Sequence, residues 1–291
     1  MKTKTTGIVA KTERITCPLC QTTPSENWAE ENGYVAVKCK KCGLVYVNPR
    51  PVAALVQEGV ETGIHKEVDA EKNAIARRIP KKVDRYKKLF GAMFKDVFDA
   101  NLGIRWLDVG AGYGEVVEAI TAIAPEGSIV EGIEPMTPKA EAAKKLGLKV
   151  REGYVEDVAE RYDFASLVNV FSHIPDFALF LRSVAKILRP GGELFLETGN
   201  VGDLANPSKV PTDLNLPDHL VFAGEETIRR FLDEAGFEII AIKRARKDSF
   251  FGAIKLLAKK CRGDVVNLTI PYTSQYRSLR IRAKLRDVEL P

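Results

Sequence analysis

The stretch that decides the fold is Asp108-Val109-Gly110-Ala111-Gly112-Tyr113-Gly114. It follows the apolar run 104–107 and precedes an amphipathic segment at 115–124, so it predicts a sharp turn between a strand and a helix. The glycines allow this turn and leave bare Cα atoms that a ligand can approach closely. A strand, a glycine-rich turn and a helix in this order are typical of the first unit of a Rossmann-like sheet.

The rest of the C-terminal part repeats the same rhythm of short apolar runs and amphipathic segments. Strands are predicted at 104–107, 128–133, 164–170, 193–198 and 237–242, and helices at 115–124, 138–146, 177–188 and 225–235. This order predicts a doubly wound α/β fold with a mostly parallel sheet. The period-two pattern of 278–285 predicts one more strand, which follows an amphipathic segment around 250–260.

Four of the five cysteines form two C-x-x-C pairs at the N-terminal end. Cys17 and Cys20 are separated from Cys39 and Cys42 by 18 residues, a spacing typical of zinc ribbons. Four thiolates fill a tetrahedral shell and leave no position for a catalytic water, so we expect a structural Zn²⁺. Two alternatives are cysteines without a metal and a redox pair, and the second is disfavoured because neither pair opens a helix after a strand.

These patterns predict three parts in the chain. Residues 1–50 form the zinc ribbon, 51–100 a helical linker or cap, and 101–291 the Rossmann-like domain with an insertion at 246–277. The apolar residues of 83–97 recur at spacings of three and four, which predicts a helix that packs on the following part.

Composition sets broad limits on partners and location. The net charge of +5, from 44 basic and 39 acidic residues, is too small to indicate nucleic acid by itself. No leader-like or membrane-spanning apolar run is visible, and paired cysteines favour a reducing compartment, so we expect a cytoplasmic protein without a membrane partner. The oligomeric state stays open.

The glycine-rich turn raises the question of which cofactor it holds. A dinucleotide fingerprint requires G-x-G-x-x-G, whereas Glu115 occupies the third glycine position and Asp108 would lie beside a pyrophosphate, so NAD is disfavoured. Asp108 instead suits the cationic methionine end of S-adenosylmethionine. Glu134 ends the next predicted strand, where a carboxylate can accept both ribose hydroxyls. The alternative is that Asp108 only forms the turn and that Glu134 is a solvated strand end.

Several runs together resemble the successive motifs of class I S-adenosylmethionine-dependent methyltransferases. They are LDVGAGYGE (107–115), the acid Glu134, NVFSHIPD (169–176) and LRPGGELFLETGN (188–200), and the resemblance spans about 82–242. It implies a seven-stranded sheet whose last strand is antiparallel. It also implies that the glycine loop holds the methionine end, Glu134 the ribose and 155–157 the adenine. The expected cofactor-binding residues are Asp108, Gly110, Ala111, Gly112, Gly114, Glu134, Pro135, Val155, Glu156 and Asn169.

The cysteine pairs followed by GLVYVNPRP (43–51) resemble a bacterial subgroup that joins a zinc ribbon to this domain, often in sugar-modifying and antibiotic pathways. The segment 216–222 is similar to a Glu-His pair followed by an aromatic residue in sugar C-methyltransferases, in which the histidine is the base. This similarity implies His219 as the catalytic base, with Asp218 beside it and His173 as a further candidate. A purely structural histidine is the alternative. Many members of the subgroup have an acid where Ser172 precedes His173, so any role of that acid is absent here.

The function predicted from these features is methyl transfer from S-adenosylmethionine to an oxygen or carbon of a small molecule. A sugar-like or phosphorylated acceptor is expected, because the basic pairs 77–78, 81–82 and 87–88 could hold a phosphate. The alternatives are an rRNA or tRNA methyltransferase and a non-enzymatic binding scaffold.

Overall fold

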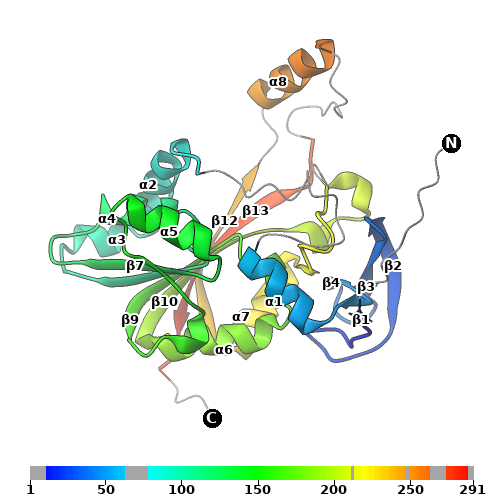
Figure 1. Cartoon of the computed structure of the whole chain (residues 1–291), viewed down its shortest axis with the longest axis horizontal. Coiled ribbons are helices and arrows are strands. Elements are labelled where there is room, and N and C mark those ends of the chain that lie inside the picture. Colours follow the sequence, from blue (N-terminus) through cyan, green and yellow to red (C-terminus); the bar gives the residue numbers. More distant parts are fainter. Residues whose placement is uncertain (1–10, 63–77, 211–212, 247–249, 263–272, 288–291) are drawn as a thin grey trace.

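A seven-stranded sheet lies at the centre of the computed structural model, which describes residues 11–62, 78–210, 213–246, 250–262 and 273–287 (Figure 1). The strand order is β12-β13-β10-β9-β6-β7-β8. Its strands are β6 (Arg105–Val109), β7 (Ile129–Glu134), β8 (Val150–Glu152), β9 (Tyr162–Val168), β10 (Leu188–Gly199), β12 (Phe237–Arg246) and β13 (Arg277–Leu285).

The pairing within this sheet matches the predicted architecture. The last strand, β13, runs antiparallel to both β10 and β12, whereas β6, β7, β8, β9 and β10 are mutually parallel. The strand predicted at 278–285 is therefore confirmed. The sequence pattern assigned no range to β8, because a strand of three residues is too short to show a period.

Helices cover both faces of the sheet, as a doubly wound fold requires (Figure 1). One face packs against α2 (Lys81–Met93), α3 (Lys95–Asp99), α4 (Glu115–Thr121) and α5 (Thr137–Lys145). The other face packs against α6 (Phe177–Ile187) and α7 (Glu225–Glu234).

An aromatic cluster joins α2 and α3 to the sheet. The Phe94 and Trp106 rings lie 4.8 Å apart and the Phe90 and Phe195 rings 4.7 Å apart, both edge to face, and all four side chains are fully buried. The helix predicted from the apolar stripe of 83–97 thus packs as expected. Residues 81–99 share one core with the sheet, so the sheet domain begins before residue 101, within the segment expected to be a linker or cap.

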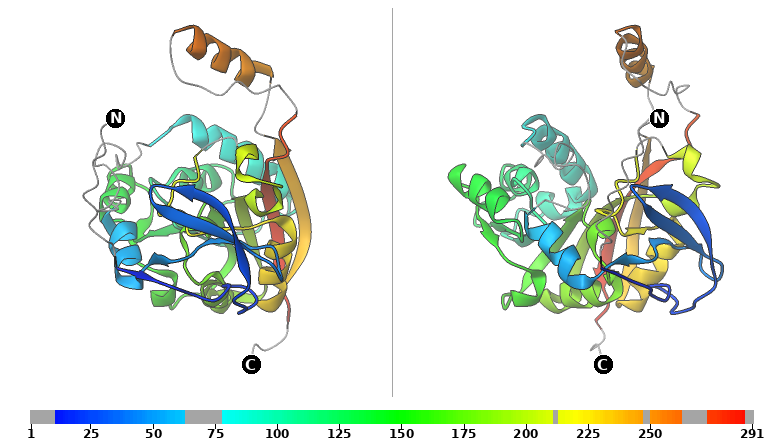
Figure 2. Two further views of the ribbon diagram at one scale, coloured as in Figure 1. Left: turned by 90° about the vertical axis from the view of Figure 1, so that its right-hand side faces the viewer. Right: turned by 45° about the vertical axis from the view of Figure 1, so that its right-hand side comes forward.

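The N-terminal part forms a small antiparallel sheet that shares the core of the opposite face. Its strands are β2 (Ser25–Glu31), β3 (Tyr34–Cys39) and β4 (Val45–Val47), and a fourth strand, β11 (Val221–Phe222), comes from the loop before α7. A separate pair, β1 (Thr12–Glu13) and β5 (Arg50–Pro51), precedes α1 (Ala53–Thr62). Figure 2 shows the blue N-terminal strands lying across one side of the molecule. The ribbon is therefore not a separate unit, because β11 completes its sheet.

The loop between β10 and α7 contains two 3-10 turns, η3 (Val201–Asp203) and η4 (Pro207–Lys209), in addition to β11. Two further 3-10 turns, η1 (Val155–Asp157) and η2 (Phe171–His173), follow β8 and β9. Residues of η1 and η2 line the cavity described below.

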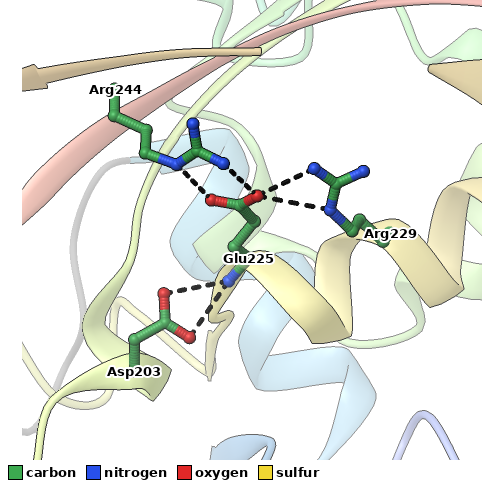
Figure 3. Close-up of polar contacts among 4 residues, drawn as sticks. All are labelled: Asp203, Glu225, Arg229 and Arg244. Atoms are coloured by element: carbon green, nitrogen blue, oxygen red, sulfur yellow. Dashed lines mark hydrogen bonds and ion pairs between the residues drawn. The ribbon is translucent and has the colours of Figure 1, made fainter.

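The predicted insertion between β12 and β13 contains α8 (Phe250–Cys261), and 247–249 and 263–272 lie outside the described residues. Figures 1 and 2 show α8 standing clear of the sheet and its helices. An ion-pair network lies near the end of β12: Glu225 binds Arg244 and Arg229, while Asp203 accepts the backbone N–H of Glu225 (Figure 3). The Arg244 guanidinium lowers the pKa of Glu225. None of the helices among the described residues is long and apolar enough to cross a membrane.

Candidate active site

A cavity of about 1120 Å³ lies at the carboxyl ends of β6, β7 and β9. Parallel sheets bind ligands at this edge, because the loops that follow the strands converge there. The ribbon contributes Glu31 and Asn32 to the lining, and α1 contributes Val56 and Val60. Tyr154 donates a hydrogen bond of 2.7 Å to Glu61, which ties α1 to the loop after β8.

The three glycines of the glycine loop have different structural roles. Gly110, Gly112 and Gly114 all have positive φ, at 73°, 57° and 79°. A Cβ on Gly112 would meet nothing within 4 Å, so this glycine faces open space. A Cβ on Gly114 would lie 2.5 Å from Leu148 Cδ1, and Gly114 does not line the cavity. Gly114 therefore permits close packing of α4, whereas Gly110 and Gly112 line the space available to a ligand.

Asp108 lies at the end of β6 and is 2% exposed. Ser166 Oγ donates a hydrogen bond of 2.5 Å to its carboxylate, and Trp106 Nε1 donates one of 3.0 Å to Ser166. Burial raises the pKa of Asp108 to about 8, the Ser166 hydroxyl opposes this shift, and the nearby Glu134 and Glu115 add to it. A cation beside Asp108 would reverse the shift, so the position suits a positively charged ligand group.

Glu134 ends β7 and is also buried, at 6% exposed. Its carboxylate accepts the backbone N–H of Gly112 at 2.7 Å and that of Met136 at 3.1 Å. Each bond engages a different oxygen, and a carboxylate oxygen can accept a second hydrogen bond. Glu134 is therefore fixed in place and can still accept hydroxyls from the cavity.

The remaining predicted cofactor residues also line the cavity. Ala111, Pro135, Val155, Glu156 and Asn169 come from the four loops that follow β6, β7, β8 and β9. Of the ten residues predicted, Gly114 alone is absent from the lining. The sequence analysis did not anticipate Lys82, Tyr86 and Met136, which line the cavity as well. Tyr86 and Met136 look like ordinary core residues in the sequence, and Lys82 looks like a residue of an exposed helix face.

The three predicted catalytic residues come together. His173 Nδ1 lies 3.1 Å from Asp218 Oδ1 and 3.2 Å from the backbone oxygen of Asp218. The rings of His173 and His219 meet edge to face at 4.8 Å, and one ligand atom from each of the three residues lies within 4.8 Å of the others. His173 and Asp218 line the cavity, whereas His219 is not among its lining residues. Of the two histidines, His173 is therefore the one that borders the cavity.

The ribbon holds the loop that carries Asp218. The carboxylate of Glu31 accepts the backbone N–H of Leu214 at 2.8 Å and of Leu216 at 3.1 Å, and Asn32 Nδ2 donates to the Leu216 oxygen at 2.7 Å. Leu220 N donates to Ser172 O at 2.7 Å, which fixes the same loop to the turn that contains His173. No sequence signal indicated Glu31 or Asn32, since both look like residues of an ordinary hairpin turn.

The four ribbon cysteines cluster as the spacing predicted. The Sγ atoms of Cys17 and Cys42 and those of Cys20 and Cys39 are each 3.5 Å apart, and all four lie within 4.8 Å of one another. A tetrahedron with Zn–S bonds of about 2.3 Å has edges of roughly 3.8 Å. Cys17 and Cys39 are buried and the other two are partly exposed. The donor set and its size therefore fit one zinc ion.

The lining of the cavity is strongly acidic. It contains nine carboxyl side chains and two lysines, Lys82 and Lys139. Of the basic pairs noted in the sequence, Lys82 lines the cavity, Arg78 is paired with Glu118, and Arg77 lies outside the described residues. The lining thus disfavours a ligand with a phosphate group.

Comparison with known proteins places these features in context. The sequence profile of a family described as "Methyltransferase domain" matches residues 75–242. The ubiquinone biosynthesis O-methyltransferase of Aliivibrio fischeri (strain MJ11) is 33% identical over 108 residues, which cover 34% of this chain and 45% of that protein. The mitochondrial ubiquinone biosynthesis O-methyltransferase of Homo sapiens is 32% identical over 117 residues, which cover 36% and 31%. The chain therefore spans less than half the length of these curated relatives.

Among solved structures, that of a "putative sarcosine dimethylglycine methyltransferase" from Galdieria sulphuraria superposes with a TM-score of 0.53 at 14% identity. The superposition covers 70% of this chain and 86% of that chain. At this level of identity the likeness concerns the fold, and it agrees with the sheet described above.

Proposed function

Since this chain belongs to the methyltransferase-domain family and is an S-adenosylmethionine-dependent methyltransferase, we propose that it methylates a hydroxyl oxygen of a small, uncharged molecule. One observation carries this proposal. The His173–Asp218 pair lines the same cavity as the glycine loop, Asp108 and Glu134.

The donor half of the site consists of residues that fit S-adenosylmethionine. Asp108 would hold the cationic methionine end, Gly112 leaves room for close approach, and Glu134 would accept the ribose hydroxyls. Val155 and Glu156 would flank the adenine. When bound, S-adenosylmethionine supplies an electrophilic methyl group on a sulfonium.

The acceptor half requires a group that removes the proton of the hydroxyl. A hydroxyl attacks a methyl group poorly while it keeps its proton, so a base near neutral pKa assists. With the hydrogen of His173 on Nδ1, directed to Asp218, the Nε2 atom is the basic one. Asp218 fixes this tautomer, and the ring of His219 packs against that of His173 and supports its orientation. We therefore place His173 as the base and His219 as a positioning residue.

The acceptor class follows from the lining and from the relatives. Their name, ubiquinone biosynthesis O-methyltransferase, supports transfer to oxygen on a small molecule. The excess of carboxylates argues against both a phosphorylated acceptor and RNA, because like charges repel in a partly enclosed site. A sugar-like or phenolic compound without phosphate fits best.

The ribbon has a separate role in this proposal. Four thiolates complete the coordination of one Zn²⁺, so the ion would stabilise the fold and take no part in methyl transfer. Its contribution to the site is indirect, through Glu31 and Asn32.

The test is a panel of acceptors assayed with radiolabelled S-adenosylmethionine. Catechols, free sugars, sugar phosphates and tRNA would be compared, followed by His173→Ala and His219→Ala with the accepted compound. We expect transfer to an uncharged hydroxyl compound. His173→Ala should lower kcat by on the order of 10² or more and leave cofactor binding unchanged, with a smaller effect for His219→Ala. Transfer only to phosphorylated compounds or RNA would refute the acceptor class, and a larger effect at His219 would refute the assignment of the base.

A further inference from the structure

None of the described residues of α8 lines the cavity of the proposed reaction. The helix lies between β12 and β13, and β12 points in the same direction as the other parallel strands. The end of β12 therefore lies at the carboxyl edge of the sheet, the edge that also holds the cavity. Figures 1 and 2 show the helix extending away from the molecule beyond this edge.

The helix and the residue that follows it carry basic side chains and no acidic one. Residues 250–262 contain four basic residues, Lys255, Lys259, Lys260 and Arg262, and no acid, whereas the whole chain has a net charge of +5. Lys260 and Arg262 are exposed. Arg244, which lies nearby at the end of β12, is neutralised by Glu225 (Figure 3). The segment therefore carries positive charge that no acidic residue of its own offsets.

The same helix exposes apolar side chains. Ile254 is 48% exposed and Leu257 is 53% exposed, and the two are three residues apart, so they share one face. Ala258 is exposed as well, and the sequence places two phenylalanines at the start of the helix. An apolar face beside basic residues is unfavourable in water and is typical of helices that lie in a membrane interface.

We propose that α8 binds the surface of an anionic lipid bilayer. Leu257 and Ile254 would enter the boundary between headgroups and acyl chains, while the basic residues would contact lipid phosphates. RNA would use the basic residues but would leave the aliphatic face uncovered, so the lipid surface accounts for both features. This inference revises the expectation that no membrane takes part. It concerns attachment at the surface and is independent of the methyl acceptor.

Attachment through α8 would bring the carboxyl edge of the sheet close to the bilayer. The cavity opens among the loops of this edge, so the enzyme would work next to the membrane surface.

The test is co-flotation of the full chain with vesicles of phosphatidylcholine alone or mixed with phosphatidylglycerol. Each basic residue near an anionic surface contributes about 1 kcal/mol, or roughly fivefold in affinity, so K260Q/R262Q should weaken binding to the anionic vesicles by about 25-fold. I254S/L257S should weaken it by about tenfold or more. The matched control is K144Q/K145Q on α5, which also removes two exposed basic residues and should leave binding unchanged.

The proposal predicts binding to the mixed vesicles, little binding to phosphatidylcholine alone and a decrease in binding as salt rises. Absence of flotation, or equal loss in the α5 control, would overturn it. So would a dimer in light scattering that only I254S/L257S dissociates, or RNA binding of higher affinity than vesicle binding. Each of these measurements is made without turnover, so its outcome does not depend on the proposed reaction.

Discussion

Asp108 makes the affinity for the cofactor dependent on pH. Its pKa of about 8 in the ligand-free protein means that about 1% of the side chain is ionised at about pH 6 and half at about pH 8. A cationic amino group binds the ionised form. The affinity for S-adenosylhomocysteine should therefore rise roughly 50-fold between these two pH values, which corresponds to about 2.3 kcal/mol.

Isothermal titration calorimetry measures this effect directly. Binding at about pH 7 should release close to one proton, seen as a dependence of the apparent enthalpy on the buffer. Asp108→Asn keeps the shape of the side chain and should abolish the pH dependence. Ser166→Ala removes the hydroxyl that favours the ionised form, so the rise in affinity should move to higher pH. An affinity that is flat with pH in the wild type, or an unchanged pH profile in Asp108→Asn, would refute the reasoning.

The same pKa affects the stability of the ligand-free protein. The pKa of Asp108 is raised from its ordinary value of 3.8 to about 8 in the folded protein. Below about pH 4 the side chain is protonated in both the folded and the unfolded state, so it does not lower the stability there. Between about pH 4 and about pH 8 the free energy of unfolding falls as pH rises, because the unfolded chain loses a proton that the folded protein keeps. Above about pH 8 this contribution of Asp108 is constant. Asp108→Asn should accordingly gain melting temperature relative to wild type as pH rises from about 5 to about 8.

Two further predictions concern the ribbon and the glycine loop. Metal analysis should find one zinc per chain, and Cys17→Ser should lower the melting temperature and the zinc content together; full stability without zinc would contradict a structural metal. Gly114→Ala brings a Cβ to 2.5 Å from Leu148 at positive φ and should destabilise the fold by about 2 kcal/mol or more, whereas Gly112→Ala faces open space and should mainly weaken cofactor binding. Chemical denaturation and calorimetry separate the two effects, and equal losses of stability would show that the glycines do not differ in role.

Most of the sheet could be predicted from the sequence, because its strands are apolar runs that alternate with helices having clear amphipathic faces. The last strand was predicted at 278–285 and is found as β13. The strands that the sequence did not reveal include β8 and β11. The three-residue β8 shows no period, and the two-residue β11 is a strand only because β4 lies beside it.

The residues of the candidate site that could be predicted are those whose position follows from the sequence immediately around them. Asp108 and Glu134 each lie at the carboxyl end of a parallel strand, so their meeting at one edge follows from topology. The residues that hold the loop of Asp218 could not be predicted in this way. Glu31, in a hairpin, accepts a hydrogen bond from Leu214 of this loop, 183 residues further along the chain. We propose His173 rather than His219 as the base because His173 lines the cavity. Which of the two histidines does so depends on tertiary packing and cannot be predicted from the spacing of residues in the sequence.

The pairing of β4 with β11 also has a consequence for synthesis of the chain. Asn32 and its partner Leu216 are 184 residues apart, so the ribbon emerges from the ribosome long before the strand that completes its sheet. Until then the outer edge of β4 offers unpaired backbone groups, which invite pairing with another chain. Contacts between such distant residues also slow folding. The edge of β4 in the nascent chain is therefore left unprotected until β11 has been synthesised.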